Sequence, residues 1–294
     1  MMAWEVYSVA DLERGLRLTP PARLAVFGDP VAHSRSPQLH NPALQACGID
    51  AQYIRLHVPP ADFEQALGQC RALGFLGTNC TIPHKFAALQ AVDEPDALAR
   101  QLGAVNTIVF RSGRMLGFNT DGPGLLRAVK EEFGLDLRDV RVLVIGAGGG
   151  AGRAAAIQCA LERCPRLVLA NRTRTKIESL ARELAAFYPA NWVTLQEHPD
   201  PRDADLVINA TSVGMKKDDP QLMSPGQIES RHCVLDMIYS PPETALLCAA
   251  REQGARVANG LSMLLHQGAV SFEHWFQRPA PLEAMRAGLR SSCS

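Results

Sequence analysis

The first candidates for chemistry in this sequence are a lysine and an aspartate, Lys85 and Asp121. Lys85 closes the polar segment 79–85, and Asp121 follows an Asn-Thr pair. A lysine and a carboxylate can handle the proton that a reacting hydroxyl or carbonyl group gives up or takes. Pro83 favours an early helical position, so we expect Lys85 in the first turn of a helix. Each residue alone has an ordinary explanation, because most lysines are solvated and an aspartate before Gly-Pro is usually a helix cap.

Four polar segments of this kind occur in the first half of the chain, where a core would favour apolar residues. They are 33–37 (His-Ser-Arg-Ser-Pro), 79–85 (Asn-Cys-Thr-Ile-Pro-His-Lys), 104–107 (Ala-Val-Asn-Thr) and 119–122 (Asn-Thr-Asp-Gly). We expect each at a strand end or a helix start, where α/β sheets bind ligands. Neutral hydrogen-bonding groups with one or two titratable ones suit a polyhydroxylated substrate.

A glycine-rich loop is the second element that predicts chemistry. Residues 142–145 (Val-Leu-Val-Ile) predict a strand that leads into Gly146, Gly148 and Ala151, which match G-x-G-x-x-[G/A] before a predicted helix. The first glycine allows the tight turn, and the second lets the backbone approach a pyrophosphate. The small third residue allows close packing of helix and strand, and the helix N-terminus supplies N–H donors. This context favours a dinucleotide site over a flexible loop.

The end of the next predicted strand indicates which dinucleotide binds. An acidic residue there would bind the ribose hydroxyls of NAD, but residues 171–176 read Asn-Arg-Thr-Arg-Thr-Lys. We expect Arg172 to bind the 2′-phosphate of NADP, with Lys176 adding charge from the next turn. The alternative is a solvated basic helix start, although cations at a helix N-terminus oppose the helix dipole. The sequence therefore favours NADP.

The elements that would position these residues are short apolar strands alternating with amphipathic helices, which is typical of α/β domains with parallel sheets. In the first half we expect strands near 24–27, 53–57, 77–81 and 107–110, and helices near 37–46, 62–73 and 83–89. In the second half we expect strands near 142–145, 166–170, 206–209 and 234–237, and helices near 149–163, 175–187 and 244–253. The segment 261–275 has helical spacing, and residues 1–20 are expected to form an N-terminal extension.

Length and composition limit the class of protein. The chain has 294 residues, enough for two domains, and 30 basic residues balance 30 acidic ones. We therefore expect no binding to nucleic acid or to an anionic membrane. No apolar run approaches the roughly 20 residues of a membrane span, and no export signal is visible. The 8 cysteines form no C-x-x-C pair, so no metal site is expected, and the predicted location is cytoplasmic.

Taken together, the motifs between residues 24 and 277 resemble the shikimate dehydrogenase family. Residues 28–37 are similar to its G-x-P-x-x-H-S-x-S-P, 79–85 to N-x-T-x-P-x-K, 103–107 to G-A-x-N-T and 117–122 to G-x-N-T-D-G. Residues 209–215, 236–239 with Pro241, and 263–267 resemble its later motifs. Two residues depart from the pattern: Cys80 stands where a β-branched residue is usual, and Lys176 where an arginine is common.

The resemblance implies a fold and a set of site residues. Residues 1–120, completed by 260–294, would form a substrate-binding and catalytic domain with a mainly parallel sheet, and 121–259 a Rossmann-like NADP-binding domain, with the active site in the cleft between them. Lys85 and Asp121 would be the catalytic pair. The substrate would be bound by Ser34, Ser36, Asn79, Thr81, Asn106, Tyr239 and Gln267. The cofactor would be bound by Gly146, Ala147, Gly148, Gly149, Gly150, Ala151, Asn171, Arg172, Thr173, Lys176, Thr211, Met215 and Gly260.

The activity that the resemblance implies is the reversible, NADP-dependent reduction of 3-dehydroshikimate to shikimate in aromatic amino-acid biosynthesis. One alternative is a quinate/shikimate dehydrogenase that uses NAD or NADP. Another is a non-catalytic NADP-binding regulator on the same fold, although a regulator would need neither Lys85 nor Asp121. The expected partner is the small-molecule substrate, and a homodimer is the candidate assembly.

Overall fold

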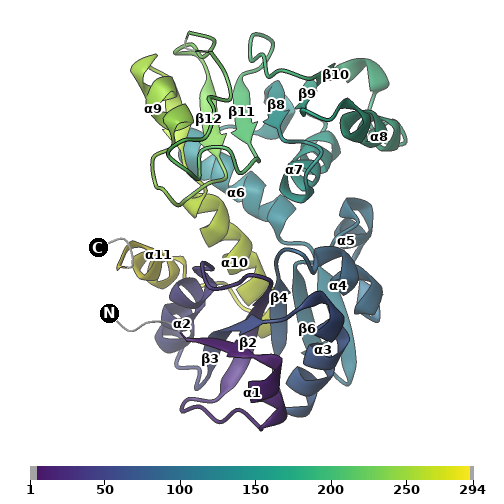
Figure 1. Cartoon of the computed structure of the whole chain (residues 1–294), viewed down its shortest axis with the longest axis vertical. Coiled ribbons are helices and arrows are strands. Elements are labelled where there is room, and N and C mark those ends of the chain that lie inside the picture. The colour runs from purple at the N-terminus through teal and green to yellow at the C-terminus, as the bar shows by residue number, and fades with distance from the viewer. Residues whose placement is uncertain (1–4, 225, 292–294) are drawn as a thin grey trace. The chain divides into compact units, whose positions relative to one another are not determined.

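The computed structural model describes residues 5–224 and 226–291, which fold into two compact units. The first unit contains the chain up to Gly124 and again from Gln267, and the second unit contains Leu125–His266 (Figure 1). Each unit is built on one β-sheet with helices packed against it. The predicted fold class, two α/β domains with parallel strands, is confirmed.

A seven-stranded sheet forms the centre of the first unit. Its strands, in spatial order, are β1 (Val6–Ser8), β3 (Gln52–His57), β2 (Ala22–Gly28), β4 (Gly77–Cys80), β6 (Thr107–Arg111), β7 (Arg114–Phe118) and β5 (Glu94–Pro95). Neighbouring strands are parallel from β1 to β4 and between β7 and β5, whereas β6 is antiparallel to both β4 and β7. Because β6 reverses the chain direction between them, β4 and β7 end at the same edge of the sheet.

Helices bury both faces of this sheet. They are α1 (Val9–Glu13), α2 (Ser36–Ala46), α3 (Phe63–Ala72), α4 (Lys85–Ala91), α5 (Ala97–Leu102) and α11 (Leu282–Ser291), with a 3-10 turn, η1, at Pro60–Asp62. Phe63 of α3 packs edge-on against Phe27 of β2, with ring centroids 6.2 Å apart. On β3 lies α2, and α11 packs against α2. Burial on two faces explains why β2 is a nearly continuous apolar run.

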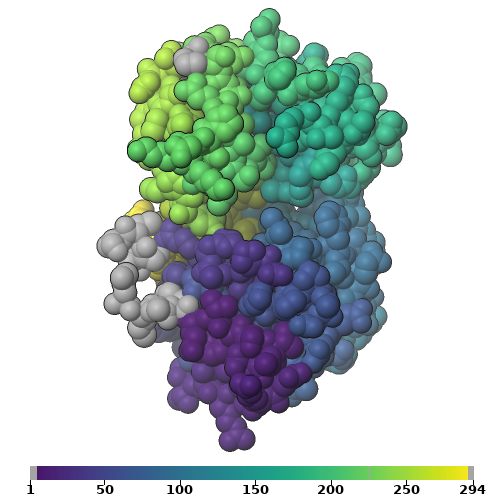
Figure 2. Space-filling model, viewed as in Figure 1, coloured from purple at the N-terminus to yellow at the C-terminus, as the bar shows by residue number. Residues whose placement is uncertain are grey.

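The N-terminal residues belong to this unit, so the prediction of an N-terminal extension is wrong for residues 5–20. Strand β1 pairs in parallel with β3, and its Val6 lies opposite Arg55. Val9 and Leu12 of α1 are 7% and 2% exposed and join the core around α3. The purple residues in Figures 1 and 2 accordingly lie against the rest of the unit. A three-residue strand is too short to give a detectable alternation, and residues 1–4 lie outside the described residues.

The second unit contains a six-stranded, fully parallel sheet. Its order is β10 (Val193–Gln196), β9 (Leu167–Ala170), β8 (Val142–Ile145), β11 (Leu206–Asn209), β12 (Cys233–Asp236) and β13 (Arg256–Ala258). This is the strand order of a Rossmann fold, with β8 and β11 at the point where the order reverses. The helices are α7 (Gly150–Leu161), α8 (Arg174–Leu184) and α9 (Ala245–Glu252), and 3-10 turns lie at Leu137–Asp139 (η2) and Ala190–Trp192 (η3).

Two longer helices contribute residues to both units. They are α6 (Asp121–Phe133), which begins in the first unit, and α10 (Leu261–Phe276), which ends in it. In the first unit, the ring of Trp275 on α10 donates its Nε1 proton to the carbonyl of Ile108 at 3.0 Å. No helix within the described residues is long and apolar enough to cross a membrane.

One helix that positions a candidate residue begins later than the sequence predicts. The predicted helix at 83–89 starts at Lys85, because the N–H of His84 bonds the carbonyl of Thr81 at 2.8 Å and closes a turn that includes Pro83. Lys85 is therefore the first residue of α4, and its predicted place in a first helical turn is confirmed.

Candidate active site

The polar segments of the first unit meet at one edge of its sheet. Strand β4 leads into Lys85, β6 begins directly after Asn106, and β7 ends shortly before Asp121. Since β6 is antiparallel to β4 and to β7, the ends of β4 and β7 lie beside the start of β6. Sheet order therefore brings together residues that are far apart in the sequence.

Lys85 and Asp121 form an ion pair at this edge. Nζ of Lys85 lies 2.5 Å from Oδ2 of Asp121, and the two side chains are 27% and 14% exposed. Asp121 is the first residue of α6, and its N–H bonds Oδ1 of Asn119 at 3.0 Å. The carbonyl of Lys85 accepts the N–H of Val105 at 3.0 Å. A fixed ammonium and carboxylate in contact, still reachable from solvent, can pass a proton to a bound ligand.

Asn106 connects this ion pair to the rest of the edge. Its Nδ2 donates to Oδ1 of Asp121 at 2.9 Å and to Oγ1 of Thr120 at 3.0 Å. Its Oδ1 accepts the N–H of Thr120 at 2.8 Å, and the residue is 3% exposed. The amide of Asn106 therefore holds the carboxylate oxygen that Lys85 does not contact.

Asn79 is the centre of a second group of buried hydrogen bonds. Its Nδ2 lies 3.1 Å from the carbonyl of Asn106, 3.0 Å from Oγ1 of Thr107 and 3.1 Å from Oγ of Ser271. Its Oδ1 accepts the hydroxyl proton of Tyr53 at 2.6 Å. Helix α10 thus supplies Ser271 to an edge that is otherwise formed by the N-terminal part of the chain.

Ser34 and Ser36 form a pair at the start of α2. Their hydroxyl oxygens lie 3.1 Å apart, and the residues are 8% and 7% exposed. Nε of the buried Arg55 donates to the carbonyl of Ser34 at 2.8 Å, which brings a guanidinium group next to the serines. Two hydroxyl donors close to a positive charge suit a carboxylate ligand.

The structure divides the remaining predicted substrate residues between the two units. Thr81 follows β4, and its N–H bonds the carbonyl of Phe27 at 2.9 Å. Gln267 lies on α10, where Gly124 of α6 approaches so closely that an added Cβ would be 2.8 Å from the Gln267 nitrogen. Tyr239 lies in the second unit, three residues after β12.

The glycine-rich loop of the second unit has the backbone that close approach of a ligand requires. Gly146 follows β8 with φ of 82°, and an added Cβ would lie 2.6 Å from Cγ2 of Thr211. On Gly148 an added Cβ would lie 2.9 Å from Cγ of Asn171, whose Oδ1 accepts the Gly148 N–H at 3.3 Å. The loop leads into α7, whose free N–H groups suit a pyrophosphate.

The neighbouring predicted cofactor residues occupy distinct backbone positions. Ala147 is fully buried, Gly149 is the N-cap of α7 and Gly150 is its first residue. Gly260 directly precedes α10, and an added Cβ there would lie 2.1 Å from a carbonyl oxygen of the loop after β12. At Gly260, only a glycine fits this close contact between two backbone segments.

The role that the sequence pattern gave to Ala151 is wrong. Ala151 is exposed on α7, whereas Gly152 is buried and faces the loop. An added Cβ on Gly152 would lie 2.2 Å from the carbonyl oxygen of Gly146. Gly152 is therefore the small residue that allows the helix to pack closely on the loop, and a run so rich in glycine fits the pattern in more than one register.

The end of β9 presents cations and no acidic residue. Arg172 and Lys176 are exposed, and neither forms an ion pair with any residue that the structure describes. Arg174, in contrast, pairs with Glu178 at 2.9 Å. Thr173 is the N-cap of α8, so Lys176 lies in the first turn of that helix. Two cations without an internal carboxylate fit an anionic group such as a 2′-phosphate.

Asp236, at the end of β12, holds the loops beside the glycine-rich segment. Its carboxylate accepts hydrogen bonds from Nδ2 of Asn209 at 3.0 Å, from the N–H of Ile238 at 3.0 Å and from the hydroxyl of Thr244 at 2.6 Å. Burial raises the pKa of Asp236 above its ordinary value. Asn209 in turn accepts the N–H and the hydroxyl of Thr211 at 3.0 and 2.8 Å. The buried carboxylate thus fixes the loop that carries Thr211.

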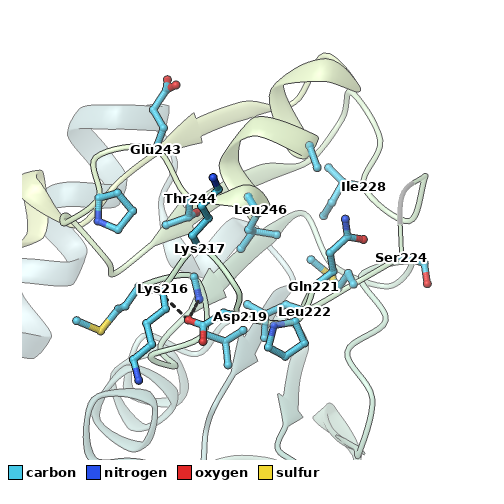
Figure 3. Close-up of a pocket in the computed structure, with 18 of the residues that line it drawn as sticks. Lys216, Lys217, Asp219, Gln221, Leu222, Ser224, Ile228, Glu243, Thr244 and Leu246 are labelled. Atoms are coloured by element: carbon cyan, nitrogen blue, oxygen red, sulfur yellow. Dashed lines mark hydrogen bonds between the residues drawn. The ribbon is translucent and has the colours of Figure 1, made fainter.

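The loop continues to Met215, whose side chain is 53% exposed although it is large and apolar. Oδ2 of Asp219 accepts the N–H groups of Gly214 and Lys216 at 2.9 and 3.0 Å, as Figure 3 shows. These bonds fix the backbone on both sides of Met215. An exposed apolar side chain on a fixed loop is available to a flat, apolar ring of a ligand.

A cavity of about 590 Å³ lies between this loop and α9 (Figure 3). Its lining combines apolar side chains such as Leu222, Ile228 and Leu246 with the charged Lys217 and Glu243. Among the described residues that line it, Met215 is the one predicted site residue. The lining thus contains none of the predicted catalytic or substrate residues.

Sequence reasoning missed several residues that contact the predicted ones. Ser271 lies one helical turn after Gln267, and its Oγ donates to the Gln267 carbonyl at 3.0 Å. Because residues four apart share a helix face, this spacing could have indicated Ser271. Thr120 lies within the polar segment 119–122, in which the sequence indicated only Asp121 as a site residue. No feature of the sequence indicated Tyr53, because an aromatic residue in a buried strand is usually a core residue.

Three parts of the chain match described protein families. Residues 26–108 match the shikimate dehydrogenase substrate binding domain, and residues 127–222 match the family described as shikimate / quinate 5-dehydrogenase. Residues 260–290 match the shikimate 5′-dehydrogenase C-terminal domain.

Relatives extend this similarity over almost the whole chain. A shikimate dehydrogenase (NADP(+)) of Symbiobacterium thermophilum is 43% identical over 278 residues, which cover 91% of this chain and 93% of that protein. The shikimate 5-dehydrogenase of Thermus thermophilus, solved with NADP(H) and shikimate, is 34% identical with a TM-score of 0.83, covering 92% of this chain and 99% of that one. A quinate dehydrogenase of Corynebacterium glutamicum, solved with NAD, is 30% identical with a TM-score of 0.84, covering 92% and 99%. The chain belongs to the shikimate dehydrogenase family.

Proposed function

We propose that this chain catalyses the reversible, NADP-dependent reduction of 3-dehydroshikimate to shikimate. The observation that carries the proposal is the 2.5 Å pair of Lys85 and Asp121, framed by Asn106 at an edge of neutral hydrogen-bonding side chains. A non-catalytic regulator on the same fold would have no use for such a pair. Relatives named shikimate dehydrogenase (NADP(+)) support the same activity.

The proposed chemistry places a proton donor at the substrate oxygen. NADPH, when bound, supplies a hydride to the carbonyl carbon. The Lys85 ammonium gives its proton to the carbonyl oxygen, which becomes the hydroxyl of shikimate. Asp121 stays ionised and holds Nζ in line through Oδ2, while Asn106 holds its other oxygen. In the oxidation direction, neutral Lys85 takes the hydroxyl proton, so the same pair serves both directions.

The substrate residues that we propose are neutral hydrogen-bonding groups. Ser34 and Ser36 bind the carboxylate, next to the guanidinium of Arg55. The remaining proposed residues contact the ring hydroxyls or the carboxylate, and they are Asn79, Thr81, Asn106, Tyr239 and Gln267. Hydrogen-bonding sites of this type reject analogues that leave their buried polar groups unpaired.

For the cofactor, we propose NADP, held by the glycine-rich loop with Arg172 and Lys176 on the 2′-phosphate. Support comes from the absence of a carboxylate at residues 171–176 and from the two cations that have no ion-pair partner among the described residues. Asn171, Thr173, Thr211, Met215 and Gly260 complete the proposed contacts. An acidic residue at the end of β9, which would favour NAD, is absent from residues 171–176.

Quinate oxidation is the second candidate, because a quinate dehydrogenase solved with NAD is similar to this chain over 92% of its length. Quinate carries one more hydroxyl than shikimate at the carbon that bears the carboxylate. The two serine hydroxyls are 3.1 Å apart and buried, and if they bind the carboxylate as proposed, both side chains would crowd the added hydroxyl. We therefore propose a preference for shikimate.

One assay tests the proposal. The purified chain is supplied with NADP or NAD and with shikimate, quinate or no substrate, and reduction of the cofactor is followed by absorbance. The proposal expects the highest kcat/KM with shikimate and NADP. A higher value with quinate and NAD would favour the second candidate, and no turnover with either acid would favour a regulator.

A further inference from the structure

Tyr53 is a buried residue of β3 whose hydroxyl bonds a proposed substrate residue. It is 1% exposed and donates to Oδ1 of Asn79 at 2.6 Å. Asn79 also contacts Thr107 and Ser271, so Tyr53 bonds the residue at the centre of the buried hydrogen-bond group. One phenol hydroxyl thus contacts a proposed substrate residue from behind.

The side-chain amide of Asn79 has two possible orientations, which exchange Oδ1 and Nδ2, and its neighbours select one of them. Its Nδ2 has two protons and lies within 3.1 Å of three acceptors, namely the Asn106 carbonyl, Thr107 and Ser271. The hydroxyls of Thr107 and Ser271 can donate as well as accept, but the Asn106 carbonyl can only accept, so a reversed amide would place two oxygens in contact. With Nδ2 facing that carbonyl, Oδ1 points to the hydroxyl of Tyr53, which donates to it at 2.6 Å and holds it in place. In this orientation, Oδ1 keeps a second lone pair for a substrate hydroxyl.

The ring of Tyr53 is itself held by aromatic neighbours. It stacks on His40 with centroids 4.5 Å apart and lies 6.0 Å from the ring of Trp275. His40 is fully buried, and burial lowers its pKa to about 3, so it stays neutral and acts as a flat support. Asn41 bonds both backbone groups of Tyr53, at 2.7 and 2.9 Å. The phenol oxygen therefore has a fixed position.

We propose that Tyr53 is a positioning residue for the substrate: together with the Asn106 carbonyl and Ser271, it holds the amide of Asn79 in the place where it binds shikimate. The inference rests on the proposed function. Tyr53 touches neither Lys85 nor Asp121 in any interaction of the described residues, so it acts on binding and not on proton transfer.

The test is Tyr53→Phe, which removes one oxygen and keeps the ring. We expect the KM for shikimate to rise about tenfold, because the amide oxygen of Asn79 loses the hydrogen bond that holds it. The kcat value should stay within about threefold and the KM for NADP should not change, since the acid/base pair and the second unit are untouched.

Tyr188→Phe is the matched control. Tyr188 is 2% exposed, lies in the second unit and donates to the carbonyl of Cys164 at 2.6 Å. Both variants lose a buried phenol hydroxyl and should melt at lower temperature, but only Tyr53→Phe should change the KM for shikimate. An unchanged KM in a folded Tyr53→Phe protein would overturn the inference while leaving the proposed function intact.

If the Tyr53→Phe protein does not fold, Ser271→Ala tests the same inference. It removes a partner of the Asn79 nitrogen and so loosens the amide, which should raise the KM for shikimate with kcat nearly constant. A KM equal to that of the unmodified chain would contradict the inference. Absence of shikimate turnover by the unmodified chain would overturn the proposed function and the inference together.

Discussion

Asp121→Asn removes the negative charge of the carboxylate but keeps nearly the same side-chain shape. In the native chain, Oδ2 accepts from Lys85 at 2.5 Å and Oδ1 accepts from Asn106 at 2.9 Å. An asparagine has one acceptor oxygen, so either Lys85 or Asn106 must face an NH2 group. The variant therefore loses one hydrogen bond of this network and the charge that holds the ammonium of Lys85.

The size of the effect follows from this lost contact. A hydrogen bond to a charged group contributes about 1.5–3 kcal/mol, and each 1.36 kcal/mol is a factor of ten in rate. We expect kcat of Asp121→Asn to fall about 10–10²-fold, because the 14% exposure of Asp121 leaves little solvent to replace the bond. Lys85→Ala removes the proton donor itself and should cost about 10²–10⁴-fold. The KM for shikimate should change much less in both.

Steady-state oxidation of shikimate with NADP measures these effects. Asp136→Asn is the control, because Asp136 pairs with Arg138 at 2.7 Å in the second unit and has no proposed role. Since Lys85 and Asp121 act as a unit, the double variant should be little slower than Lys85→Ala alone. Near-normal turnover by Lys85→Ala would remove Lys85 from the mechanism, and a fully additive double variant would show that the two residues act independently.

Three further changes test the cofactor, the substrate and the stability of the second unit. Arg172→Ala should raise the KM for NADP far more than that for NAD, because loss of a phosphate partner typically costs about 2–5 kcal/mol; equal use of both cofactors by the unmodified chain would contradict this assignment. Ser34→Gly should bring kcat/KM for quinate closer to that for shikimate, since crowding excludes an extra hydroxyl by only about 10²-fold; an unchanged ratio of the two specificity constants would show that the serine does not limit the pocket. Asp205→Asn should lower the free energy of unfolding near neutral pH by up to about 1 kcal/mol, because hydrogen bonds from Arg141 hold the pKa of Asp205 below its ordinary 3.8. This stability is present above the ordinary pKa and is lost as the pH falls through the lowered one, so denaturation curves of the two proteins should converge in acid.

The strands that the sequence predicted best are those buried on both faces. Residues 142–145 and 206–209 are strands with the predicted bounds, because a central parallel strand is a run of apolar residues with clear ends. The strand Arg114–Phe118 was missed, although Ser112 and Gly113 before it have φ of 50° and 77° and form a tight connection to β6. A Ser-Gly pair between two apolar segments was the signal for that hairpin.

The site was predictable residue by residue but not as an arrangement. Motif resemblance identified Lys85 and Asp121, whereas their contact depends on β6 lying between β4 and β7, which no local pattern contains. The glycine-rich run predicted the loop, yet the choice between Ala151 and Gly152 needed the distance to a backbone oxygen. The domain boundaries at 120 and 260, a homodimer and a cytoplasmic location stay predictions.

The division of charge at the substrate edge has a chemical reason. Asn79, Asn106, Thr107 and Ser271 are neutral, and their hydrogen bonds to one another satisfy their buried polar atoms. Neutral groups bind substrate hydroxyls without the desolvation cost of a buried ion. A second charged group in this network would also compete with Asp121 for the ammonium of Lys85. Keeping the network neutral leaves that ammonium with one carboxylate partner among the described residues, Asp121 at 2.5 Å. In the proposed mechanism, the neutral side chains can then bind the substrate hydroxyls while the ammonium faces the substrate oxygen.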